Sequence, residues 1–210
     1  HQAAIDELTQ ALDWQPLDQR TLVEFLRRRA ELGMIVGAED KAAADLERAY
    51  EVVGAELIPD LIDGLERWRS AATRRSDRDG ERAATIRLVE ILGKEGAADQ
   101  ARHTLASWVA REPGDTQALR MLMAMDTAAG SWESVIESCT RLVAAETGEA
   151  QISAVLQLVE ACEKVGRPND AKPGLEIVDC CLHFASAAAH RARHPVQCPQ
   201  TVEDRAADPR

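Results

Sequence analysis

Aromatic side chains are scarce in this sequence: Phe, Trp and Tyr together make up 3% of its 210 residues. β-Sheets draw heavily on aromatic and β-branched residues, whereas Ala, Leu, Glu and Arg, which dominate here, favour helices. Hydrophobic residues still reach 45%, which is enough to bury a core in a chain of this length. The composition therefore predicts an all-α protein built as one extended domain.

Positive charge, long apolar runs and cysteine are also limited. The formal net charge of −11 argues against binding nucleic acid, because phosphate recognition needs a basic surface. No run approaches the roughly 20 apolar residues of a membrane span. The five cysteines are too scattered for a disulfide scaffold, and we expect Cys139 and Cys162 to be reduced and buried. We expect a cytoplasmic protein; because the chain opens at His1 without an initiator Met, we expect a fragment or a processed form.

Catalytic and metal-binding signatures are missing as well. The sequence has no phosphate-binding glycine loop, no GxSxG and no HExxH, so we expect neither an enzyme nor a cofactor. The residue types that zinc prefers gather near the C-terminus, at Cys180, Cys181, His183, His190, His194 and Cys198. No CxxC pair is among them, and two adjacent cysteines chelate one ion poorly, so we expect no metal site. His103 is expected to be a surface histidine.

What the sequence does contain is a recurring spacing of small and apolar residues. Ala4, Leu8 and Ala11 are followed by Pro16, and the same offsets recur from Ala101 onward. The full set of copies is Ala4-Leu8-Ala11, Ala42-Leu46-Ala49, Ala101-Leu105-Trp108, Val135-Cys139-Leu142 and Ala171-Leu175-Val178. Gly96, Gly130 and Gly166 mark turns at intervals of 34 and 36 residues. Such a period predicts stacked helix-turn-helix units.

Periodicity and breaks predict the individual helices. They are 2–13, 17–33, 41–53, 55–75, 81–94, 98–111, 116–129, 132–145, 150–165 and 171–178. Asp115 or Thr116 is expected to cap the helix that follows it. Residues 33–41 are interpreted as an insertion, and the helix within 55–80 does not fall into the repeat register.

These features resemble the tetratricopeptide (TPR) repeat family, in which a helix A and a helix B form each repeat. Ala101, Leu105, Trp108 and Pro113 match the helix B pattern, as do Ala4, Leu8, Ala11 and Pro16; Leu88, Leu122 and Leu158 share one helix A position. Val89, Met123 and Val159 depart from the family, which usually has a small residue there. The resemblance implies antiparallel helix hairpins stacked into a right-handed α-solenoid over 1–178, clearest over 82–178. Residues 179–210 would be a divergent C-terminal cap or an irregular tail.

The resemblance also implies a binding face. In that family the A helices line the concave side, and the register points eight residues there: Ile86, Glu90, Gln117, Arg120, Ala124, Ser153, Leu156 and Glu160. This mixture suits a partner peptide or helix. The lysines and asparagines of the family's carboxylate clamp are absent. We therefore expect a non-catalytic protein-interaction scaffold, or alternatively a sensory or regulatory arm of a larger signalling or transcription-control protein. Because the chain begins in a segment like helix B, its exposed edge could also pack against a second copy.

Overall fold

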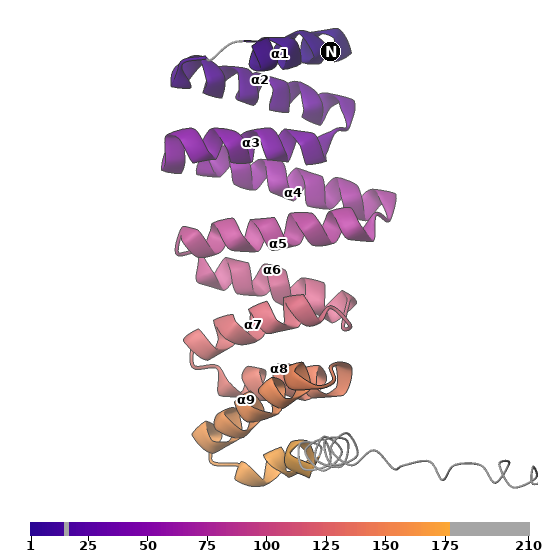
Figure 1. The fold of residues 1–210 in the computed structure, drawn as a ribbon, viewed down its shortest axis with the longest axis vertical. Helices are drawn as coiled ribbons and strands as arrows, with labels where there is room; N and C mark the ends of the chain where they lie inside the picture. Colours follow the sequence, from indigo (N-terminus) through magenta and orange to yellow (C-terminus); the bar gives the residue numbers. More distant parts are fainter. Residues whose placement is uncertain (15–16, 177–210) are drawn as a thin grey trace, which may run out of the picture. The chain divides into compact units, whose positions relative to one another are not determined.

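The computed structural model describes residues 1–14 and 17–176, and these residues are helical almost throughout (Figure 1). The elements are α1 (Gln2–Trp14), α2 (Gln19–Val36), α3 (Glu39–Val53), η1 (Gly54–Leu57), α4 (Ile58–Arg75), α5 (Arg78–Lys94), α6 (Ala98–Arg111), α7 (Thr116–Ala128), α8 (Trp132–Ala145), α9 (Glu149–Val165) and η2 (Pro168–Ala171). No strand occurs in these ranges, which confirms the all-α prediction. None of their helices is long and apolar enough to cross a membrane.

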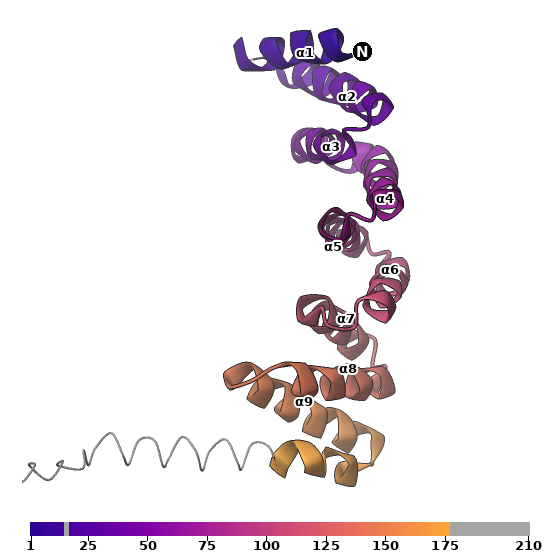
Figure 2. The ribbon, with the colours of Figure 1, turned by 90° about the vertical axis from the view of Figure 1, so that its right-hand side faces the viewer.

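The chain divides into two compact units, His1–Ser134 and Val135–Arg210. In the first unit, consecutive helices pack against one another from α1 to α7. Figure 2 shows α3, α5 and α7 on one side and α4 and α6 on the other. Arg27 of α2 reaches Asp60 of α4 at 2.6 Å, so α2 lies beside α4. We call α1, α3, α5 and α7 the odd layer, and α2, α4 and α6 the even layer.

This alternation corrects two expectations about the N-terminal half. The pattern at Ala4–Ala11 and at Ala42–Ala49 was expected in helix B, but α1 and α3 lie in the same layer as α5, the expected helix A. Helix α4, expected to be out of register, occupies a regular even-layer place between α3 and α5. The pattern misleads because small residues at these offsets allow close packing in either layer. The first described helix is consequently an odd-layer helix, and the predicted lack of a helix A before it is wrong.

The expected insertion at 33–41 is also wrong. Helix α2 runs through Gly33 to Val36, and only two residues separate it from α3. Gly33 is buried, and a Cβ placed there would lie 3.2 Å from the Cβ of Ala42. Gly33 therefore serves close packing of α2 on α3 rather than ending the helix. The turn itself is made by Gly37, whose φ of 80° a glycine adopts without strain.

A core of leucines and alanines runs through the first unit. Its fully buried members include Leu26, Leu61, Leu65, Ala84 and Leu105, each 0% exposed. Because no repeat can bury its apolar face alone, each helix pair depends on its neighbours for this burial.

The second unit contains most of α8, all of α9 and the helical residues after η2. The side-chain amide of Gln151 on α9 donates to the carbonyl of Val143 on α8 at 2.9 Å. Gly174 allows close approach to α9, because a Cβ there would lie 3.2 Å from Val155 Cγ1. Cys139 and Cys162 are free, buried thiols, as predicted. Residues 177–210, which include the expected cap or tail and the Cys/His cluster, lie outside the described residues.

Candidate interaction face

The sequence-predicted site residues of the first unit lie on two neighbouring odd-layer helices. Ile86 and Glu90 are on α5, and Gln117, Arg120 and Ala124 are on α7. None of the five is buried, whereas the alternate face of each helix is closed into the core. The core-facing residues of these two helices include Leu88, Val89, Leu92, Leu119, Leu122 and Met123. The helical register alone thus separates the two faces.

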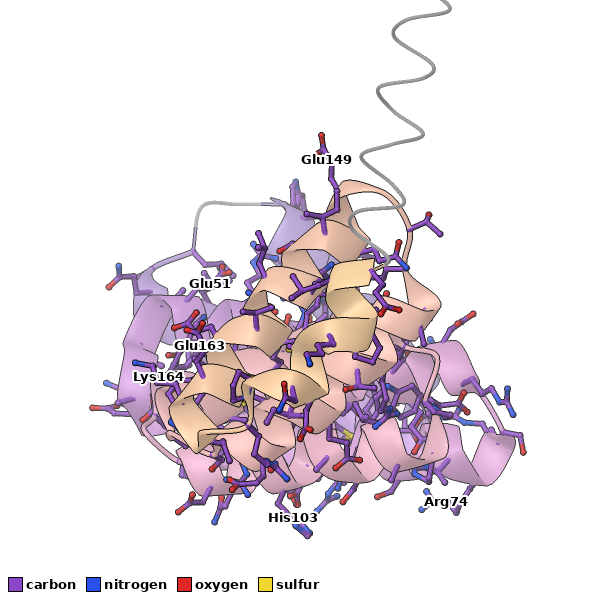
Figure 3. All side chains as sticks on the ribbon, turned by 90° about the horizontal axis from the view of Figure 1, so that it is seen from below. Glu51, Arg74, His103, Glu149, Glu163 and Lys164 are labelled. Atoms are coloured by element: carbon purple, nitrogen blue, oxygen red, sulfur yellow. The ribbon has the colours of Figure 1, made fainter. Side chains whose placement is uncertain are left out.

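The remaining predicted site residues lie on α9 of the second unit. Ser153 is half-buried, Glu160 is exposed, and Leu156 is 62% exposed, which is unusual for a leucine. Figure 3 shows Glu149, Glu163 and Lys164 projecting outward from the two ends of this helix. Glu149 is in the first turn and Lys164 in the last, where each charge suits the helix dipole.

Glu90 belongs to a small network of charges between α3 and α5. Arg87 pairs with Glu90 at 3.2 Å and reaches Glu47 of α3 at 3.7 Å. Burial raises the pKa of Glu47; Arg87 opposes this rise, while Glu90 and Glu51 add to it. One arginine therefore serves several carboxylates on this part of the odd layer.

Gln117 is oriented by Arg82, a residue that the sequence did not identify. The Arg82 guanidinium donates to Gln117 Oε1 at 2.8 Å and grips the Asp115 carboxylate through bonds of 2.6 and 3.1 Å. Asp115 also accepts from the Trp108 indole N–H at 3.0 Å and from the backbone N–H of Ala118 at 3.1 Å. The last bond confirms the predicted N-cap of α7.

The electrostatics of Asp115 follow from these donors. Burial alone would raise its pKa, but the hydrogen bonds from Arg82, Trp108 and Ala118 outweigh burial and lower the pKa to about 2. The same contact raises the pKa of Arg82. Both groups are therefore charged at neutral pH, and the pair fixes the edge of the candidate face.

A hollow of about 480 Å³ lies between α1 and α3 in the odd layer. Its lining includes Ile5, Thr9, Val36, Ala38, Lys41 and Ala44. At its base Arg29 bonds both oxygens of Asp45, at 2.8 and 2.6 Å, and donates to the Thr9 hydroxyl at 3.0 Å. Sequence reasoning missed this hollow because it placed α1 and α3 in the other layer.

The even layer carries a second groove, of about 460 Å³, between α2 and α4. Leu46 and Ala30 contribute to its apolar lining, while its rim charges pair with one another, as Asp63 does with Arg67 at 2.8 Å. On α6, in the same layer, His103 is exposed and projects outward, as predicted (Figure 3).

Metal chemistry finds no support in the described ranges, where no group of three His, Cys, Asp or Glu residues could hold an ion. The Cys/His cluster that begins at Cys180 is outside those ranges. What the odd layer offers is a partly apolar, partly charged surface suited to contact rather than to a reaction.

Helices that alternate between two layers and are joined by short turns define a helical-repeat fold, here of the TPR-like type. No family model matches the chain, and no curated protein matches it. Among solved structures, the TPR-like repeats of a putative kinesin light chain from Podosopora anserina are similar over 88% of this chain and 95% of theirs, with 16% identity and a TM-score of 0.51. A second crystal structure of those repeats aligns over 89% and 96%, with 16% identity and a TM-score of 0.50. MamA from Desulfovibrio magneticus RS-1 aligns over 75% and 94%, with 15% identity and a TM-score of 0.40.

Proposed function

We propose that this chain is a non-catalytic scaffold that binds a peptide or a helix of a protein partner on the odd-layer face. The observation that carries the proposal is the exposure of all five predicted site residues on α5 and α7, two helices whose opposite faces are buried. A TPR-like fold supports protein binding in general, because such arrays present extended surfaces built from successive repeats.

The chemistry of the face suits a protein segment. Ile86 offers apolar area, Gln117 offers an amide already held in place by Arg82, and Glu90 and Arg120 offer charges of both signs. An extended peptide needs hydrogen-bonding groups for its main chain and pockets for alternate side chains, and an amphipathic helix needs an apolar strip with a polar rim. The same face supplies both kinds of contact over a short distance along each helix.

The proposal is tested by charge reversal with matched variants. The test variant carries Glu90→Lys and Arg120→Glu on the odd layer; the control carries Glu66→Lys and Arg74→Glu on α4 in the even layer. Each pair leaves the net charge unchanged, and Glu66 and Arg74 are exposed. Partners captured by the unaltered chain are identified, and the affinity of a purified partner is then measured for all three proteins.

The expected result is a loss of affinity of about tenfold or more in the odd-layer variant and little change in the control, since a like-charge contact at an interface is costly. Equal affinities in all three proteins would remove the odd-layer face from consideration. Loss in the control alone would assign binding to the even layer. Thermal unfolding of each variant separates a lost contact from a lost fold.

A further inference from the structure

One position of the repeat is buried in two helices and open in a third. Leu105 on α6 and Cys139 on α8 are both 0% exposed. Leu175, which follows Cys139 at the same 36-residue interval that separates Gly130 from Gly166, is 43% exposed. The residue at this position normally belongs to the core, so its exposure marks a face that lacks a cover.

The companion helix of the same hairpin shows the same deficit. Val89 on α5 is 4% exposed, whereas the equivalent Val159 on α9 is only half-buried. Ile86 on α5 is half-buried, whereas the equivalent Leu156 on α9 is 62% exposed. In the first unit, α7 packs next to the α5–α6 hairpin. The described residues of the second unit end at Glu176, and no described element holds the matching place there.

The sequence after Glu176 contains a segment suited to this place. Ala84, Ala118 and Ala154 are 0% exposed on successive odd-numbered helices, at intervals of 34 and 36 residues. Ala188 and Ala189 follow Ala154 at intervals of 34 and 35. The segment 182–194 ends just before Pro195, which is a natural limit for a helix.

The pattern of this segment has two unlike sides. At helical spacing, one side would carry Leu182, Ala185, Ala188, Ala189 and Ala192. The other would carry Ser186, His190, Arg191 and His194. Small residues on one side allow close approach to a neighbour, and polar residues on the other suit the outer surface of a terminal repeat.

We propose that residues 182–194 of this chain cover the face that Leu175, Leu156 and Val159 leave open, as a short terminal helix with a polar outer side. The inference does not depend on the proposed function. A helix of this length is only marginally stable by itself in water, so it forms here only by packing on the last hairpin.

Hydrogen exchange on the full chain tests the proposal with two adjacent alanines. Ala188→Asp places a charge on the packing side, and Ala187→Asp places the same charge on the polar side. Leu175→Asp removes the apolar contact from the described hairpin. The amides of residues 185–194 are expected to exchange about tenfold or more slower than in an unstructured peptide. This protection is lost in Ala188→Asp and Leu175→Asp and retained in Ala187→Asp.

Three outcomes would overturn the proposal. The first is exchange at the unstructured rate in the unaltered chain, and the second is an equal effect of Ala187→Asp and Ala188→Asp. The third is protection that appears only as protein concentration rises, together with a dimer in sedimentation. That result would assign the open face to a second copy of the chain.

Discussion

At the scale of the residue, the carboxylate of Asp115 receives hydrogen bonds from Arg82 on α5, from Trp108 on α6 and from the first turn of α7. Its side chain is 9% exposed, so few of these bonds are replaced by water when one partner is removed. Arg111 adds a second link, pairing with Glu81 at 2.6 Å while its guanidinium lies 5.6 Å from the centre of the Trp108 ring. Three helix ends are therefore joined through polar groups.

We expect Asp115→Ala to lower the free energy of unfolding by about 2 kcal/mol, because it removes an N-cap and leaves the Trp108 and Arg82 donors without their acceptor. Urea titration measures the change. The control is Asp99→Ala, an exposed acidic residue in the first turn of α6, which should cost about 0.5 kcal/mol or less. Similar costs at the two positions would contradict the role given to Asp115.

The same carboxylate predicts a pH dependence. Its pKa is about 2 in the folded chain against an ordinary value of 3.8, so its stabilisation is complete above about pH 4 and is lost as the pH falls toward 2. The unaltered chain should exceed Asp115→Asn in stability by an amount that is constant at higher pH and shrinks by about 2 kcal/mol across this window. Urea midpoints of both proteins at several pH values provide the measurement. A difference that stays constant down to pH 2 would show that Asp115 has an ordinary pKa.

At the scale of the element, α4 is a regular member of the array. Leu61 and Leu65 are each 0% exposed, and the helix packs on both α3 and α5. Gly64 brings α4 close to α3, since a Cβ there would lie 2.6 Å from Leu46 Cδ1. Its burial is as complete as that of the helices whose register was clear from the sequence.

Leu65→Ala should therefore cost about 3 kcal/mol of stability, the range for a leucine removed from a closed core. Arg67→Ala, two residues away, breaks only an exposed pair with Asp63 and should cost about 0.5 kcal/mol or less. Chemical denaturation of the two variants gives the comparison. A small cost at Leu65 would mean that α4 lies loosely on the array.

Element boundaries were predictable where punctuation and packing agree. The predicted ranges 98–111 and 132–145 are those of α6 and α8, because glycine turns lie shortly before both helices. Helix α5 begins earlier than predicted because Asp77 accepts from the Gly80 N–H at 2.9 Å and turns a polar stretch into the first helical turn. Gly33 misled in the opposite direction, since a glycine that closes a helix pair has the same letter as one that ends a helix.

The candidate face was predictable in part for the same reason. Exposure of Ile86 and Gln117 follows from helical register, which one sequence contains. The contacts of Arg82 with Gln117 and of Arg87 with Glu47 do not, because they depend on which helices are neighbours within a layer. That arrangement requires counting every helix correctly, and α4 was left out of the count.

At the scale of the molecule, the main contacts of the described residues join elements that follow one another in the chain. Stability in such an array is close to a sum of local and nearest-neighbour contributions. We expect Leu65→Ala to speed hydrogen exchange in α3, α4 and α5 while leaving the amides of α9 unchanged. Peptide-resolved exchange at moderate urea measures both regions at once. Equal acceleration in α9 would indicate that the two units unfold as one.

The short turns between helices have a further consequence for how the chain reaches its structure. Helix α2 meets α3 after Gly37 and Ala38, and α4 meets α5 after Ser76 and Asp77. Closing such small loops costs little entropy, and proteins dominated by contacts near in sequence fold within microseconds to milliseconds. Each hairpin of the first unit can therefore form as soon as its second helix has left the ribosome, before the rest of the chain has been made.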